Sequence, residues 1–139
     1  MLNRLTWAQC FALLIGLALV AGGVVGLLTV NDSFATGTDV NGERLLVFEV
    51  NGWHNLLLIV TGSIGILAAG FPSLAKIYAG VVGVIYLVAA VWGIVDQNSV
   101  ADLIASNRWD WLLHLGVGIL GIEAASVSGP GKRYVLRSR

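Results

Sequence analysis

The chain has 139 residues, which is enough for one domain. Hydrophobic residues make up 57% of the chain and charged residues 12%, against roughly 25% charged residues in an average soluble domain. A soluble protein this short has no way to bury so much apolar surface, and the formal net charge of zero gives no general attraction to nucleic acid. Residues 1–139 are therefore predicted to form a single membrane domain.

The first predicted element is a membrane-spanning helix over about residues 7–30. Its apolar run exceeds the roughly 7–15 residues of a signal-peptide core and ends in no clear cleavage site, so we interpret it as a retained span. It contains Cys10, the single cysteine, which rules out an intrachain disulfide and a cysteine-based metal cluster. Gly22 and Gly26 form a GxxxG pair, which we expect to pack within the chain rather than at a dimer face.

Residues 31–52 form the next segment, a loop that is predicted to cover the outer end of the bundle. Turn-forming residues stand at its start, and the β-favouring stretch 43–50 is compatible with a short strand, a hairpin or an interfacial helix. The loop is too short to be a domain, and it is also a candidate for docking a partner.

Three further apolar runs follow, over about residues 53–70, 77–95 and 109–127. Each is near the roughly 20 residues that a helix needs to cross the hydrocarbon core. None has the strict alternation of a membrane β-barrel strand. The predicted fold is therefore an all-α membrane protein, a four-helix transmembrane bundle followed by a tail over residues 128–139.

The charges separate by loop, and this separation predicts the orientation. Bases without acids occupy the amino end, the second-to-third connection and the tail, namely Arg4, Lys76, Lys132, Arg133, Arg137 and Arg139. Seven acids and two bases occupy the other two loops, namely Asp32, Asp39, Glu43, Glu49, Asp96, Asp102, Asp110, Arg44 and Arg108. We therefore expect both termini in the cytoplasm of a bacterium and the spans in its inner membrane.

The second half of the chain resembles the first half. Gly62 and Gly65 of the second span match Gly118 and Gly121 of the fourth. Gly16 of the first span matches Gly83 of the third. Chance similarity between Gly- and Leu-rich helices is the alternative. Two tandem helical hairpins in the same orientation predict a pseudo-twofold axis along the membrane normal.

Small residues recur at helical spacing along the second and fourth spans and predict where helices touch, because close approach in lipid depends on them. These packing stripes are Gly62, Gly65, Ala69, Gly118, Gly121 and Ala125. Near the inner end, Glu123 is expected to reach the headgroups or to form an ion pair with Lys76 or an arginine of the tail. Tyr78 and Tyr86 of the third span are expected to form interhelical hydrogen bonds.

A candidate polar network lies at the outer mouth of the bundle, where polar groups at membrane depth are functional candidates by default. Its members are Asn51, His54, Asn55, Asn107, Asp110 and His114. The repeat aligns His54 with Asp110, which places His114 one turn deeper, roughly 6 Å away at 1.5 Å per residue. That offset is awkward for two axial haem ligands, and a local pair between Asp110 and His114 is the simpler expectation.

Three segments carry a family resemblance: Phe48-Glu49-Val50-Asn51-Gly52-Trp53-His54-Asn55 with Thr61-Gly62, then Val82-Gly83-Val84-Ile85-Tyr86-Leu87, then Leu113-His114-Leu115. They resemble a family of small, largely actinobacterial membrane proteins known only as domain of unknown function number 4383. The resemblance runs from the first span through the fourth. It implies four membrane helices and no established activity, cofactor or catalytic residue. One departure is Leu58, where the family pattern often has a second histidine.

The sequence contains no catalytic motif and no metal-binding spacing, so an enzyme is disfavoured and no cofactor or metal is predicted. The leading hypothesis is a structural or accessory subunit that contacts lipid and packs with other membrane subunits or with itself. The second is a small transporter or channel component, which the internal repeat favours. The third is a haem-binding redox protein using His54 and His114.

Overall fold

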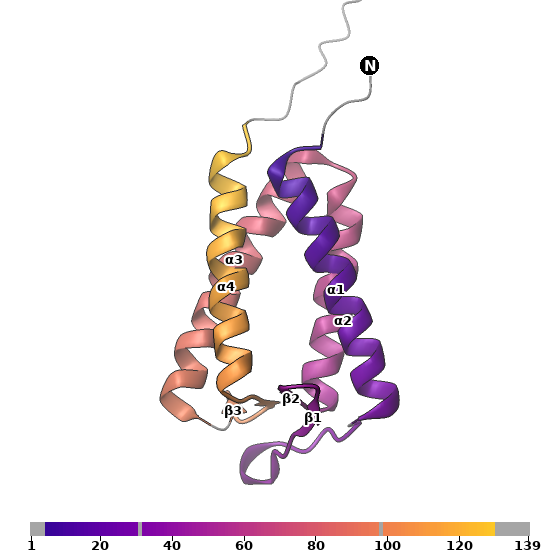
Figure 1. The fold of residues 1–139 in the computed structure, drawn as a ribbon, viewed down its shortest axis with the longest axis vertical. Helices are drawn as coiled ribbons and strands as arrows, with labels where there is room; N and C mark the ends of the chain where they lie inside the picture. Colours follow the sequence, from indigo (N-terminus) through magenta and orange to yellow (C-terminus); the bar gives the residue numbers. More distant parts are fainter. Residues whose placement is uncertain (1–4, 31, 98, 130–139) are drawn as a thin grey trace, which may run out of the picture.

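The computed structural model describes residues 5–30, 32–97 and 99–129, and within them the chain forms two helical hairpins (Figure 1). The first hairpin consists of α1 (Trp7–Thr29) and α2 (Gly52–Ala69), and the second of α3 (Pro72–Asp96) and α4 (Arg108–Val127). All four helices are long and apolar enough to cross a membrane. The predicted all-α membrane fold is confirmed.

The helix boundaries follow local chemistry. Thr6 and Gln9 form a capping box at the start of α1, with Thr6 Oγ1 accepting from Gln9 N at 3.2 Å and Gln9 Oε1 accepting from Thr6 N at 3.0 Å. α3 begins at Pro72, ahead of the expected residue 77, because proline is well suited to the first turn of a helix, where its missing N–H is not needed. Of the predicted tail, only Ser128 and Gly129 are among the described residues.

Both long connections of the hairpins lie at the same end of the bundle, which we call the strand end (Figure 1). The first connection contains a short 3-10 helix (Gly37–Asp39) and an antiparallel pair, β1 (Glu43–Leu45) and β2 (Phe48–Val50). The hairpin is thus one of the three alternatives that the sequence left open for residues 43–50. The second connection contains another antiparallel pair, β3 (Ser99–Val100) and β4 (Ile104–Ala105), which sequence reasoning missed.

Glycines bring the two helices of each hairpin into backbone contact. A Cβ atom at Gly16 would lie 2.8 Å from Gly62 O, and a Cβ atom at Gly83 would lie 3.0 Å from Gly118 O. No side chain fits at such distances, so the interhelical distance is set by glycine in both hairpins.

The core between the hairpins is densest toward the opposite end, where α2 and α3 are joined through Gly70 and Phe71. Buried alanines and rings fill it, among them Ala8, Phe11, Ala12, Ala75, Tyr78 and Ala79. The hairpins diverge from there toward the strand end (Figure 1). The space between them at that end is where the polar residues gather.

Candidate functional site

The six polar residues predicted at the outer mouth lie together at the strand end, in the caps and first two turns of α2 and α4. Five of them are buried, namely Asn51, His54, Asn55, Asp110 and His114, and Asn107 is half-buried. Groups so far removed from solvent are stable only if most of them have hydrogen-bond partners.

Two asparagines start the helices that carry these residues. Asn51 Oδ1 accepts a hydrogen bond from His54 N at 3.0 Å and caps α2. Asn107 Oδ1 accepts from Trp109 N at 2.8 Å and from Asp110 N at 3.4 Å and caps α4. The caps therefore fix the first turns that bear the histidine and the aspartate.

The same asparagines join the two halves of the chain. Asn51 Nδ2 donates to Leu103 O at 2.8 Å, and Asn107 Nδ2 donates to Val47 O at 3.0 Å. Each amide thus reaches from the helix of one hairpin to the connecting loop of the other. We call these the reciprocal asparagine bonds, and they close the bundle at the strand end.

Asp110 adds a third link between the halves. Its Oδ2 accepts from Glu49 N of β2 at 3.0 Å and from Asn107 N at 2.8 Å. Partial burial raises the pKa of the Glu49 carboxyl, the neighbouring Asp110 carboxylate raises it further, and Arg44 lowers it. An acidic pair therefore stands where the strands meet the helices.

The tautomer of neutral His54 follows from its neighbours. Its Nδ1 lies 3.1 Å from both Glu49 O and Ala105 O, and carbonyl oxygens only accept hydrogen bonds. Nδ1 of the neutral ring therefore carries the hydrogen, and Nε2 keeps its lone pair as an acceptor.

His114 has an unusual environment for a buried polar group. It is 6% exposed, and its Nδ1 has no hydrogen-bond partner among the described residues. Its ring centroid lies 6.1 Å from that of His54 and 5.1 Å from that of Tyr86, which it meets edge-on at 82°. The sequence predicted an offset of one turn between the two histidines, and their rings lie close together in the structure.

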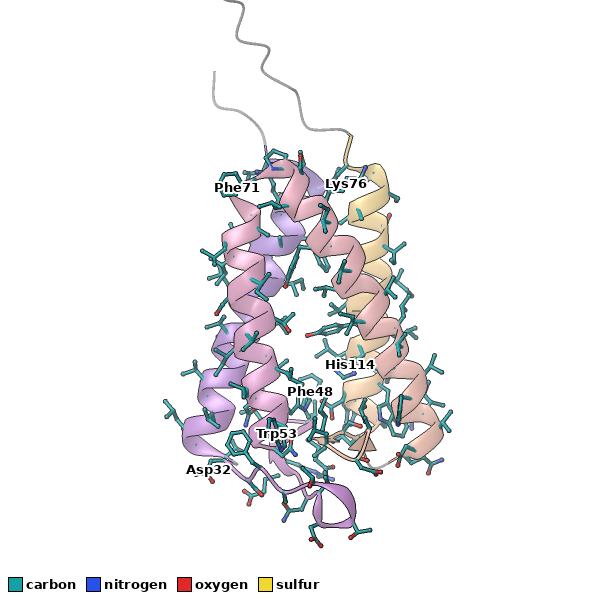
Figure 2. The ribbon with its side chains drawn as sticks, turned by 180° about the vertical axis from the view of Figure 1, so that it is seen from behind. Asp32, Phe48, Trp53, Phe71, Lys76 and His114 are labelled. Atoms are coloured by element: carbon teal, nitrogen blue, oxygen red, sulfur yellow. The ribbon has the colours of Figure 1, made fainter. Side chains whose placement is uncertain are left out.

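A cavity of about 250 Å³ adjoins these rings. Its polar lining comes from His54, Tyr86, Asp110 and His114, and the rest of its wall is mainly aliphatic. Figure 2 shows His114 and Phe48 pointing into the space between the hairpins near the strand end. The sequence predicted an interhelical hydrogen bond for Tyr86, but within the described residues its side chain lines this cavity and forms none.

A protein-family model matches most of the chain. The family model for Domain of unknown function (DUF4383) matches residues 9–127. The chain belongs to this family. A search of curated proteins and a search of solved structures each gave no match.

The packing stripes and the GxxxG pair predicted from the sequence also lie within the residues that match DUF4383. In the packing stripes, Gly62, Gly65, Ala69, Gly118 and Gly121 are buried and Ala125 is half-buried. Gly26 contacts Asn55, whereas a Cβ at Gly22 would meet nothing within 4 Å.

Lys76 and Glu123 are the two charged residues predicted near the inner end of the bundle. Lys76 Nζ donates to Ser128 O at 2.8 Å, and Glu123 is exposed on α4. Figure 2 shows Lys76 at the end of the bundle opposite the strands. Within the described residues, no group of three or more His, Cys, Asp or Glu side chains is placed to hold a metal ion.

Proposed function

We propose that this protein is an accessory membrane protein that docks to a larger membrane assembly through the tip of its β1–β2 hairpin. The tip consists of Leu46 and Val47, which are 85% and 46% exposed. The proposal rests on the backbone conformation at this tip and on the chemistry that surrounds it.

The observation that carries the proposal is the φ angle of 60° at Leu46. A side chain in this left-handed region costs about 1–3 kcal/mol, and glycine would avoid that cost. A large apolar side chain that is both strained and exposed contributes little to this fold. Its presence supports a role in contact with another molecule.

The surroundings of the tip indicate the chemistry of the partner. Leu46 and Val47 adjoin a shallow groove of about 260 Å³ that is also lined by Arg44, Arg108 and Trp109. Two guanidinium groups beside an indole suit a partner surface with acidic and apolar side chains, because arginine and tryptophan are common anchors in protein interfaces.

The distribution of polar groups weighs against the transporter alternative. The buried cluster lies at the strand end, whereas the half of the bundle near Phe11 and Tyr78 is filled mainly by rings and alanines and contains the buried polar residues Gln9 and Ser128. A polar path across the described bundle would need further polar residues in that half.

The cavity beside His54 and His114 weighs against the haem alternative, because its volume of about 250 Å³ is below the roughly 300 Å³ lower bound for a drug-sized ligand.

Two further features belong to this proposal. The strand end faces outward and both termini lie in the cytoplasm, which the positive-inside rule supports.

The two hairpins are copies of one unit related by a pseudo-twofold axis along the membrane normal. The equivalent glycine contacts of Gly16 with Gly62 and of Gly83 with Gly118 support the duplication, as do the reciprocal asparagine bonds.

The test is native mass spectrometry of the protein gently extracted from its own membrane, comparing wild type with Leu46→Gly. We expect wild type to carry a defined partner protein. We expect the variant to lose this partner while its thermal stability stays equal or rises, because glycine relieves the strained turn.

Ala101→Gly is the matched control. Ala101 has a φ of 56° in the turn between β3 and β4, and it carries no large side chain. It should keep the partner. A wild-type protein recovered only as a bare monomer, or a Leu46→Gly variant that retains its partner at full occupancy, would refute the accessory function.

A further inference from the structure

The cavity between the hairpins has the size of a small ring system. Its volume of about 250 Å³ exceeds that of the roughly 150 Å³ apolar cavities that bind benzene. It is smaller than the roughly 300–1,000 Å³ of sites for drug-sized ligands. One substituted ring, or two fused rings, therefore fits inside.

The cavity is open toward the side of the bundle. Leu45, Phe48 and Val50 of β1 and β2 close it at the strand end. The contact between Phe11 and Tyr78 closes the space between the hairpins toward the other end. Its lining includes Ala18 of α1 and Leu113 of α4, which are both exposed and lie within spans. A molecule that enters between α1 and α4 therefore comes from the bilayer and must be lipid-soluble (Figure 1).

The cavity wall offers polar atoms that the protein itself does not use. His114 Nδ1 is buried and unpaired within the described chain. The structure gives the Tyr86 hydroxyl no partner there either, although the residue is only 8% exposed. His54 adds the free lone pair of Nε2. Buried polar groups left without partners lower stability, so an occupant that supplies an oxygen atom is favoured over a purely apolar one.

From these features we propose that the cavity binds the head ring of a lipid-soluble quinone or quinol. The ring fills the apolar space between Leu58 and Val117, and an isoprenoid tail leaves between α1 and α4. A quinone carbonyl accepts hydrogen bonds from the Tyr86 hydroxyl and from a histidine N–H, and a quinol hydroxyl donates to His54 Nε2. The proposal concerns binding alone and is independent of partner docking at the hairpin tip.

Other lipid-soluble molecules fit less well. An alkyl chain would leave the histidine and tyrosine groups unsatisfied. A fatty-acid carboxylate would stand beside the buried carboxylate of Asp110, which is 2% exposed, and would be repelled. A neutral ring with oxygen substituents avoids both penalties.

The test is a titration of the purified full chain in lipid nanodiscs with a naphthoquinone that carries one short prenyl chain. Quenching of tryptophan fluorescence reports binding, and empty nanodiscs correct for partitioning into lipid. Wild type should bind saturably at one site. Tyr86→Phe should weaken binding about two- to tenfold, the equivalent of one hydrogen bond. His114→Phe should weaken it further.

Tyr78→Phe is the matched control, because it removes the same atom from the same helix outside the cavity, where the hydroxyl donates to Thr61 O at 3.1 Å. Its affinity should equal that of wild type. If His114→Phe does not fold, Leu113→Trp provides the second test, since an indole at the mouth should abolish binding. Equal affinity for the oxygen-free prenylated naphthalene, no saturable binding, or equal affinity in every variant would each overturn the proposal.

Discussion

The rings of Phe11 and Tyr78 meet between the two hairpins, with centroids 6.5 Å apart and planes inclined at 52°. Each ring also reaches a glycine of the other hairpin. A Cβ at Gly121 would lie 3.1 Å from Phe11 Cζ, and a Cβ at Gly65 would lie 2.5 Å from Tyr78 Oη. Two aromatic rings and two glycines therefore determine how closely the hairpins approach.

Substitution of a glycine at this contact should destabilise the bundle. We expect Gly121→Ala to cost about 1–3 kcal/mol, because the new methyl group would lie 2.7 Å from Ala79 O, a backbone atom that cannot move alone. Thermal unfolding in a mild detergent measures the effect. Gly116→Ala is the control, since a Cβ there meets nothing within 4 Å, and its stability should be unchanged or slightly higher. Equal stability of the two variants would contradict the packing described for α4.

The proposed duplication makes a separate, quantitative prediction. Gly16→Ala and Gly83→Ala should lower stability by amounts that agree within about 0.5 kcal/mol, since each new methyl group would press on the same backbone atoms of its partner helix. The Gly62 and Gly118 carbonyl oxygens are those atoms. Chemical unfolding of both variants in the same detergent checks the prediction. One silent variant beside one destabilised variant would argue against equivalent hairpins.

Asp110 should matter for stability through the two N–H groups that it satisfies. We expect Asp110→Ala to cost about 1–3 kcal/mol or more, because the N–H groups of Glu49 and Asn107 lose their acceptor. Asp110→Asn should cost less, since one amide oxygen accepts both bonds. Asp96→Ala, at an exposed aspartate, is the control. An equal loss in Asp110→Asn and Asp110→Ala would show that charge, rather than hydrogen bonding, is the main contribution.

The strand end should lose stability as the pH rises. The pKa of Glu49 lies above its ordinary value of 4.5 in the folded protein, so the folded state holds this proton more tightly than the unfolded state. The resulting stability is fully present below the unfolded pKa and is lost as the pH rises through the folded pKa. The midpoint of thermal unfolding, measured from pH 4 upward, should therefore decline across this window.

Two variants isolate the contribution of Glu49. Glu49→Gln should flatten the decline, whereas Glu43→Gln, at an exposed glutamate of β1, should leave it unchanged. A decline of the same size in all three proteins would assign the pH dependence to another group.

The spans were predictable because each is a long apolar run, and lipid leaves few alternatives to a helix. The polar residues of the strand end were also identified, since charge and amide groups stand out against such runs. Their geometry was not predictable. Ser99–Val100 and Ile104–Ala105 are too short to show a strand pattern, and the proximity of His54 and His114 depends on how two helices far apart in sequence are packed.

The reciprocal asparagine bonds have a consequence for how the protein is made. When synthesis has reached the end of α2 at Ala69, Leu103, which accepts the bond from Asn51, has not yet been synthesised. At about 5–20 residues per second, the roughly 34 residues from Ala69 to Leu103 take some 2–7 s. During this delay the first half of one nascent chain can pair with the second half of a neighbouring chain on the same messenger RNA. Exchange of halves between copies is thus an assembly error that this architecture permits.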